Sequence, residues 1–304
     1  MIVYNKLEDI NLVKEQCVAL GFFDGVHLGH KKVIDSAKNV AINNNFETSI
    51  FTFYFENNKR IKSNSIFSID DREKRINKLI VENYISVNFS EIKNYSPSEF
   101  VNIILKQKLK ATNIFCGQNY KFGKNASGDV NTLKKLCSEV NIKVNIVEMA
   151  VYENKIISST RIKNELQLGN IEKVNAMLGY NYCIDFKVIK GEALGRTMGF
   201  PTINQIYPSD FILPKQGVYI TKTIVDGKSY PSATGITTRP TVNGKGVSCE
   251  TFIVGLNQNL YNEKPIVEFY KYFGDVHKFE NIEELKTYIN KAVEETKKYF
   301  SFIR

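Results

Sequence analysis

Histidine, proline and long apolar runs are scarce in this chain of 304 residues, which has 3 His and 7 Pro. The first ten residues lack the basic start and apolar core of a signal peptide. No uninterrupted apolar run approaches the length of a membrane span. We therefore expect a cytoplasmic protein that does not associate with membranes.

The cysteines are also few, and the CxxC spacing of many metal and redox sites is absent. Most of them lie in apolar surroundings, as the reduced, buried thiols of a cytosolic protein do. We therefore expect no disulfides. The five are Cys17, Cys116, Cys137, Cys183 and Cys249.

Basic residues exceed acidic ones and give a net charge of +9. A basic chain can bind nucleic acid, a membrane surface or small phosphorylated ligands. Proteins that bind nucleic acid usually cluster Lys and Arg, whereas here the lysines are spread over both halves, among Glu and Asp. We expect small anionic substrates rather than a dedicated nucleic-acid partner. The sequence predicts no particular oligomeric state.

The length suits two domains, and the first half of the chain alternates strands and helices. Short apolar runs at 17–23 and 47–55 are typical of buried parallel strands. Alternation of this kind predicts a parallel sheet covered by helices on both faces, with ligands beyond the carboxyl ends of the strands. Helices are expected at 31–43, 70–80, 96–109 (with Ser96 as N-cap and Pro97 in the first turn) and 129–140.

After about residue 180 the pattern changes to short strands separated by turn signals. Such strands favour antiparallel hairpins and a small barrel. Residues 281–300 form an amphipathic pattern, and Asn281 with Glu284 is typical of a helix start. We therefore expect two domains, residues 1–180 and 181–304, the second ending in a helix.

Two of the three histidines stand in the phrase GFFDGVHLGH, residues 21–30. The phrase leads out of a strand, and a helix is expected to start at Leu28 or Gly29. His27 and His30 therefore lie near a helix N-terminus, where free N–H groups favour an anion. Gly25 and Gly29 would let a phosphate chain approach the backbone. Local capping or packing of the histidines is the alternative, and zinc binding lacks a third ligand at a usual spacing.

A second phrase, GEALGRTMGFPTINQ, covers residues 191–205. Thr202 and Asn204 are two residues apart, so in an extended segment their side chains face the same way. A hydroxyl and an amide carbonyl are hard oxygen ligands, which suit Mg²⁺ holding the phosphates of ATP. The alternative is a turn started by Pro201, in which both side chains bind their own backbone.

Residues 21–30 resemble the signature of the HxGH nucleotidyltransferases, and of bacterial FAD synthetases in particular. Two later blocks, residues 116–129 and 157–180, resemble further segments of the bifunctional riboflavin kinase/FAD synthetase family. Residues 191–205 resemble the riboflavin kinase signature of the same family. The resemblance covers nearly the whole chain and implies a Rossmann-like α/β nucleotidyltransferase domain with a parallel sheet, followed by a small antiparallel β-barrel kinase domain.

The resemblance implies that ATP converts riboflavin to FMN, and that a second ATP converts FMN to FAD, with Mg²⁺ as cofactor. His27 and His30 would stabilise the charge on the phosphates, and Glu268 would accept the proton of the attacking hydroxyl. Tyr120 and Phe122 would offer flat surfaces to a ligand or pack in the core. The implied nucleotide- and flavin-binding residues are Gly21, Phe23, Asp24, Gly25, Gly29, Asn119, Ser159, Thr160, Lys163, Gly191, Gly195, Arg196, Gly199 and Pro201.

Several positions depart from the family pattern. Residues 54–60 lack the usual His-Pro pair, and Ala126 or Ser127 stands where an arginine is usual. Lys163 and Gly274 also replace arginines. Two alternatives therefore stay open: a chain that keeps only one of the two activities, and a flavin-nucleotide-binding regulator without turnover.

Overall fold

The structure is a computed structural model that describes residues 1–56, 64–191, 194–241, 244–276 and 279–301. It divides into two compact units, Met1–Ser159 and Thr160–Arg304. Helices α6 (Ser159–Leu168) and α7 (Ile171–Leu178) follow this division, and α7 packs against a strand of the second unit. The expected division after residue 180 remains a prediction of where the functional domains meet.

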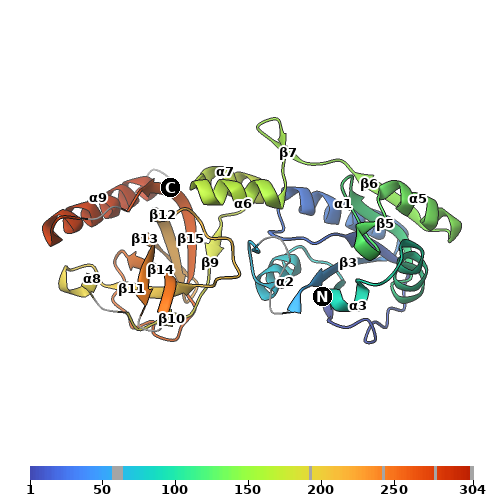
Figure 1. Cartoon of the computed structure of the whole chain (residues 1–304), viewed down its shortest axis with the longest axis horizontal. Coiled ribbons are helices and arrows are strands. Elements are labelled where there is room, and N and C mark those ends of the chain that lie inside the picture. The colour runs from blue at the N-terminus through green and yellow to red at the C-terminus, as the bar shows by residue number, and fades with distance from the viewer. Residues whose placement is uncertain (57–63, 192–193, 242–243, 277–278, 302–304) are drawn as a thin grey trace. The chain divides into compact units, whose positions relative to one another are not determined.

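The first unit is built on a six-stranded sheet in which every pair of strands is parallel, as expected (Figure 1). The strand order is β1-β4-β3-β2-β5-β6. The strands are β1 (Ile2–Tyr4), β2 (Gln16–Leu20), β3 (Glu47–Tyr54), β4 (Asn83–Asn88), β5 (Ala111–Gly117) and β6 (Lys143–Val147). The chain runs from β2 outward to β3 and β4 and returns to the other side of β2 as β5. The carboxyl ends of β2 and β5 therefore form a switch point, where sheets of this kind bind ligands.

Helices cover both faces of this sheet. Alternate residues of β2 enter two different cores, Ala19 with Ile34 of α1 on one face and Val18 with Ile104 on the other. The elements are α1 (Leu28–Asn44), α2 (Ile69–Asn77), α3 (Phe89–Ile92), α4 (Pro97–Glu99), the π-helix η2 (Phe100–Lys108), the 3₁₀-helix η3 (Lys124–Ala126) and α5 (Val130–Glu139). A hairpin of β7 (Val151–Tyr152) and β8 (Lys155–Ile156) follows β6.

The helix expected at 96–109 starts as predicted but changes type. Ser96 is the N-cap of α4, and Glu99 completes a capping box. From Phe100 onward the chain forms a π-helix, in which the amide of Leu109 donates to the carbonyl of Ile104 at 2.9 Å. The apolar spacing predicts a buried face but does not distinguish an α-helix from a π-helix.

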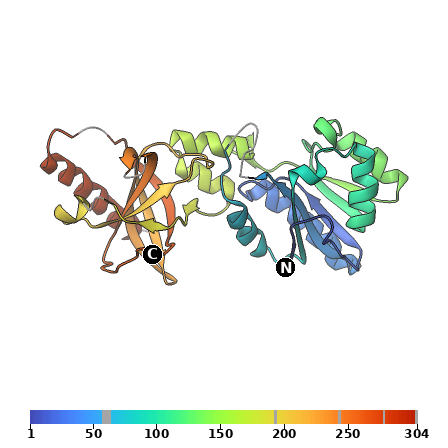
Figure 2. The same cartoon turned by 60° about the horizontal axis from the view of Figure 1, so that its bottom comes forward.

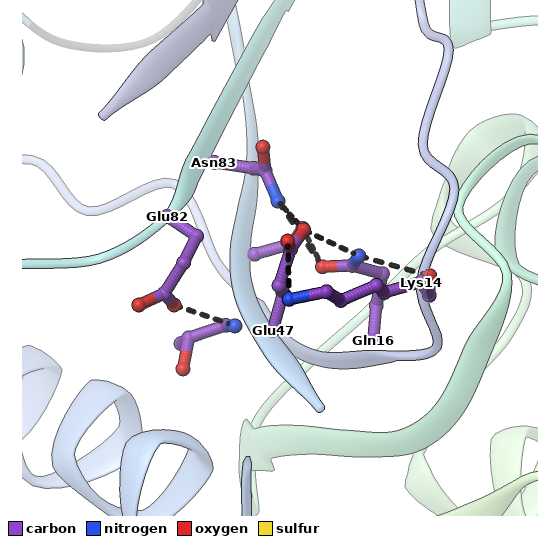
Figure 3. Close-up of polar contacts among 7 residues, drawn as sticks. Lys14, Gln16, Glu47, Glu82 and Asn83 are labelled. Carbon is purple, nitrogen blue, oxygen red and sulfur yellow. Dashed lines mark hydrogen bonds and ion pairs between the residues drawn. The ribbon is translucent and has the colours of Figure 1, made fainter. Parts of the chain in front are cut away.

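Polar side chains connect the amino ends of β2, β3 and β4 (Figure 3). The Asn83 Nδ2 atom donates to Gln16 Oε1 at 3.2 Å and to Glu47 Oε2 at 3.1 Å. Gln16 Nε2 also donates to Glu47 Oε2, and Ser49 Oγ donates to Gln16 Oε1 at 2.7 Å. Desolvation raises the pKa of Glu47, but these amide donors and the Lys14 ammonium outweigh it and lower the pKa overall. Gln16 and Asn83 are buried, so the network holds the three strands in one register.

The second unit is a seven-stranded antiparallel sheet in the order β10-β11-β14-β13-β12-β15-β9. It curls into a half-barrel that agrees with the expected small barrel (Figure 2). The strands are β9 (Cys183–Ile184), β10 (Val188–Ile189), β11 (Thr202–Tyr207), β12 (Gly217–Val225), β13 (Lys228–Thr241), β14 (Gly244–Ile253) and β15 (Ile266–Gly274), with the short helix α8 (Leu194–Thr197) before β11.

The expected final helix is α9 (Ile282–Ser301), and Asn281 Oδ1 accepts from the amide of Glu284 at its start. Ala292 and Val293 of α9 pack against Ala233 on the outer face of the sheet. Over the residues that the structure describes, no helix combines the length and apolar character needed to cross a membrane. The five cysteines are free thiols, and burial raises the pKa of Cys17 to about 11.

The inner face of the half-barrel carries hydroxyl groups where an apolar core would be usual. Thr221, Thr234 and Thr251 are fully buried and form a chain of hydrogen bonds with Oγ1 atoms 2.9 Å apart. Ser232 Oγ lies 2.8 Å from Thr221 Oγ1. Because each hydroxyl both donates and accepts, the cluster satisfies itself without water.

We expect Gln16→Leu to destabilise the first unit by about 2–4 kcal/mol, because Ser49, Asn83 and Glu47 lose a buried partner. Hydrogen exchange of peptides from β2, β3 and β4 measures the change locally, as faster exchange. The matched control is Lys14→Ala, which removes the ion pair between Lys14 and Glu47. Because the Lys14 side chain is 59% exposed, this substitution should lower the free energy of unfolding by less than about 1 kcal/mol. Equal exchange in both variants would contradict the assigned role of the network.

Candidate functional sites

The histidine turn follows β2 at the switch point of the parallel sheet. His27 is the N-cap of α1, and its Nδ1 atom accepts from the backbone amide of His30 at 3.3 Å. An accepting Nδ1 holds no proton, so the proton of neutral His27 is on Nε2. Capping, the local alternative, is therefore present, and it does not use the Nε2–H group.

The two imidazole rings are stacked, with centroids 3.6 Å apart and planes inclined by 15°. His27 is 5% exposed, and burial lowers its pKa to about 4 in spite of the nearby Asp24 carboxylate. Burial also lowers the pKa of His30 well below its usual value, and a proton on His27 or the charge of Arg72 would each add to this shift. Both rings are therefore neutral hydrogen-bonding groups at neutral pH.

Two glycines let rings of the turn lie close to the backbone. A Cβ atom at Gly29 would lie 3.1 Å from the His27 ring, and one at Gly21 would lie 2.9 Å from the Phe23 ring. Phe23, Val26 and Gly25 all have positive φ, at 54°, 39° and 85°. Two such residues other than glycine in one turn are a mark of strain kept at a functional site.

The other predicted residues of the first unit surround this turn. The Asp24 carboxylate is buried and accepts from the amide of Ile66 at 2.9 Å, while Ser159 Oγ donates to the Asp24 carbonyl at 2.8 Å. Asn119 is exposed in the loop after β5, the second strand of the switch point.

Five further positions differ in setting. Phe122 belongs to the buried core and Tyr120 packs against it, so the packing alternative holds for these two rings. Ala126 is exposed, with a φ of 55°. Thr160 is exposed and Lys163 is buried on α6, and their contact with nucleotide stays a prediction.

A cavity adjoins the histidine turn. Its walls combine aromatic rings, hydroxyls, the Asp24 carboxylate and the Arg72 guanidinium. Tyr54 and Phe55 line it at the place where the His-Pro pair is missing, whereas residues 57–60 of that segment lie outside the described residues. The lining residues are Phe22, Asp24, Tyr54, Phe55, Ser65, Phe67, Ser68, Ile69 and Arg72.

The second site is built around β11. Thr202 and Asn204 are half-buried on one face of this strand, as the sequence predicts. A Cβ atom at Gly191 would lie 2.5 Å from the Asn204 amide, and one at Gly195 would lie 2.3 Å from the Phe200 carbonyl oxygen. The glycine-rich segment therefore folds closely against the two polar side chains. The adjacent Arg196, Gly199 and Pro201 are exposed.

The register of the sheet adds a residue that the sequence reasoning missed. Asn204 pairs directly with Glu250 on β14, and Glu250 pairs with Gly235 on β13. Directly paired residues project from the same face, so the Glu250 carboxylate stands beside Asn204. Glu250 is half-buried, and its Oε1 accepts from Ser248 Oγ at 3.3 Å. The only signal in the sequence is a single carboxylate in a strand whose other charged residue is Lys245.

Glu268, the predicted base, lies elsewhere on the sheet. It pairs with Lys222 on β12 and Cys183 on β9, and its Oε2 accepts from the Tyr270 hydroxyl at 3.0 Å. Three strands separate β15 from β11, which is about 19 Å along the sheet at ~4.8 Å per strand. The structure does not bring Glu268 next to Asn204, and its catalytic role stays a prediction.

Gly274, one of the departures from the family pattern, ends the row of paired residues that contains Glu250. The row continues from Gly235 through Val218 to Gly274. A Cβ atom at Gly274 would lie 2.9 Å from the Tyr288 hydroxyl. Tyr288 therefore occupies space that a larger residue at 274 would need.

Among the described residues, no group of three or more His, Cys, Asp or Glu side chains lies close enough together to hold a metal ion. The oxygens of Thr202 and Asn204 fit a hard cation that takes its remaining ligands from phosphate and water.

Comparison with known proteins assigns the two units to two families. The family model for FAD synthetase matches residues 10–161, and that for riboflavin kinase matches residues 178–300. The fold and sites thus define a chain that joins an FAD synthetase domain to a riboflavin kinase domain. The chain belongs to the bifunctional riboflavin kinase/FMN adenylyltransferase family.

Relatives with this name match the chain over almost its full length. The protein of Listeria monocytogenes is 32% identical, covering 99% of this chain and 96% of its own. The protein of Bacillus subtilis is 33% identical, and the match covers 97% of this chain and 96% of that protein. A solved structure from Streptococcus pneumoniae, named a macrolide-efflux protein, matches with a TM-score of 0.87 and 26% sequence identity. The match covers 97% of this chain and 98% of that one.

We expect the stability of the protein to fall more steeply between pH 6.5 and about 4 than that of a His27→Asn variant. The unfolded imidazole takes up its proton near pH 6.5, but the folded one does so only near pH 4, so acid favours unfolding in this window. Asparagine keeps an N-cap without a titrating group. Denaturant unfolding at a series of pH values measures the difference, and parallel profiles would refute the buried neutral state.

Proposed function

We propose that the chain phosphorylates riboflavin to FMN with ATP in its second unit and adenylylates FMN to FAD with a second ATP in its first. The names of the relatives and both family matches support this proposal. The observation that carries it is that each unit assembles its own set of polar groups suited to phosphate. One set lies at a helix start on the switch point, and the other lies on one face of β11.

In the kinase reaction, Thr202 and Asn204 would hold Mg²⁺ through their oxygens. The cation would neutralise charge on the ATP phosphates. The Asn204 Nδ2 atom lies 3.5 Å from the Thr202 carbonyl oxygen, which turns the amide oxygen of Asn204 away from its own backbone. Most of the rate enhancement in such transfers comes from positioning and charge neutralisation.

The base of this reaction is better supplied by Glu250 than by Glu268, because Glu250 stands beside Asn204. Its carboxylate would accept the proton of the terminal ribityl hydroxyl. The hydroxyl oxygen attacks the γ-phosphorus, the bond to the bridging oxygen breaks, and ADP leaves. A base must lie within hydrogen-bonding reach of the attacking group, and a hydroxyl next to the γ-phosphate lies near the cation.

In the adenylyl transfer, a phosphate oxygen of FMN attacks the α-phosphorus of ATP, and pyrophosphate leaves. The neutral rings of His27 and His30 would donate N–H groups to the phosphate oxygens as charge moves to the leaving group. The amides at the start of α1 add further donors. Neither ring has to give up a proton, because the nucleophile is already an anion.

His30→Ala should abolish FAD formation and leave FMN formation intact, whereas Asn204→Ala should abolish FMN formation from riboflavin and leave FAD formation from supplied FMN intact. Each substitution removes phosphate contacts from one unit only. Chromatographic separation of flavins after incubation with riboflavin, Mg²⁺ and ATP gives the answer, with supplied FMN as a second substrate. Loss of both FMN formation from riboflavin and FAD formation from supplied FMN in one folded variant contradicts independent sites. Wild-type protein that yields FMN alone, or binds flavin without turnover, supports the alternatives of one activity or a regulator.

Glu250→Gln should lower the rate constant of FMN formation by about 10²–10⁴-fold, the usual range for removal of a general base. Glu268→Gln is the matched control, since it neutralises a half-buried carboxylate of the same sheet. FAD formation from supplied FMN should stay unchanged in both proteins, which shows that the first unit is unaffected. A larger loss in Glu268→Gln than in Glu250→Gln would return the role of base to Glu268.

A further inference from the structure

Arg72 is a buried arginine at the ligand-binding edge of the parallel sheet. It lies on α2 and is 5% exposed. Its Nη1 atom donates to the Phe22 carbonyl at 2.8 Å, and Nη2 donates to the Phe53 carbonyl at 3.1 Å. Phe22 follows β2, and Phe53 is near the carboxyl end of β3. The guanidinium thus reaches the edge from which the histidine turn departs.

This guanidinium has unused donors, and no carboxylate of the described residues forms an ion pair with it. Two of its five N–H groups bond to the carbonyls, and Nε is buried without a partner among the described residues. No ion pair in the described ranges involves Arg72. The Asp24 carboxylate lines the same cavity but accepts from the Ile66 amide. A buried cation without a carboxylate is costly, and in a cavity it indicates an anionic ligand.

The cavity around Arg72 is aromatic. The rings of Phe22 and Phe55 lie 6.2 Å apart, both line the cavity, and the Arg72 guanidinium lies 5.2 Å from the centroid of Phe22. Phe67 forms part of the same lining. Flat apolar walls with one fixed cation suit a planar aromatic ligand that carries an anionic group.

We propose that Arg72 binds the phosphate group of the flavin substrate, and so makes the first unit prefer FMN to an unphosphorylated flavin. The inference rests on the proposed adenylyl transfer and adds a specificity-determining residue to it. ATP could also supply a phosphate, but the donors of the histidine turn are available to it. The aromatic walls next to Arg72 fit the flavin instead.

Arg72→Met tests the proposal in the full chain. We compare the KM for FMN and the KM for ATP in FAD formation, and the inhibition constant of 5′-deoxyriboflavin, which has no hydroxyl to be phosphorylated. Loss of a charged hydrogen bond worth about 1.5–3 kcal/mol should raise the KM for FMN about 10- to 100-fold. The other two constants should change less than about twofold, as one expects when only the phosphate contact is lost.

Two variants serve as references. Lys74→Met removes an exposed cation from the same helix and should leave all three constants unchanged. Arg72→Lys keeps the charge without the forked geometry, so its KM for FMN should fall between those of the wild type and Arg72→Met. If Arg72→Met makes no measurable FAD, the comparison of constants is made with Arg72→Lys.

A rise in the inhibition constant of 5′-deoxyriboflavin equal to the rise in the KM for FMN would mean that Arg72 only shapes the pocket. A rise confined to the KM for ATP would assign the cation to the nucleotide. Either result overturns the proposal, as does an unchanged KM for FMN. These constants do not depend on the amount of folded enzyme. Wild-type protein that makes no FAD from FMN and ATP would instead refute the proposed function, before any variant is compared.

Discussion

The hydrogen bonds among Gln16, Glu47 and Asn83 fix the register of three parallel strands, and the first site depends on that register. Gln16 pairs with Glu47 at one end, so Leu20 pairs with Phe51 at the other. With this register, Thr52 Oγ1 near the end of β3 donates to the carbonyl of Phe22, just beyond β2, at 3.1 Å. A slip of one residue would exchange the two faces of a strand and separate these groups. Polar contacts at the amino ends of the strands thus help to position the groups at the opposite ends.

Strand register also determines which side chains meet at the second site, because those side chains lie on paired strands and not in loops. Asn204 and Glu250 are far apart in sequence and become neighbours because β11 and β14 pair antiparallel. The same pairing sends Cys249 and Gln205 to the inner face, where both are fully buried. One strand pair therefore supplies both part of the interior and part of the site. A change that destabilises this strand pair would therefore also displace Asn204 and Glu250 relative to each other.

Much of the first unit could be predicted, because buried parallel strands and amphipathic helices have strong periodic patterns. The histidine turn can be predicted from its two closely spaced histidines, its glycines and its place after a strand. Arg72 cannot, since a single arginine in a charged helical segment is typical of a solvated face, and only tertiary packing buries it. In the second unit Thr202 and Asn204 follow from local spacing, but Glu250 does not. Its partner depends on which strands pair, and residue patterns do not encode strand order.

The buried hydroxyls of the half-barrel also affect how this unit responds to temperature. Exposure of apolar surface raises the heat capacity on unfolding, whereas exposure of polar surface lowers it. An interior that places Thr221, Thr234 and Thr251 where aliphatic side chains would otherwise stand therefore gives a smaller heat-capacity change. A smaller change broadens the stability curve, so cold weakens this sheet less than it would weaken an all-aliphatic one of equal size.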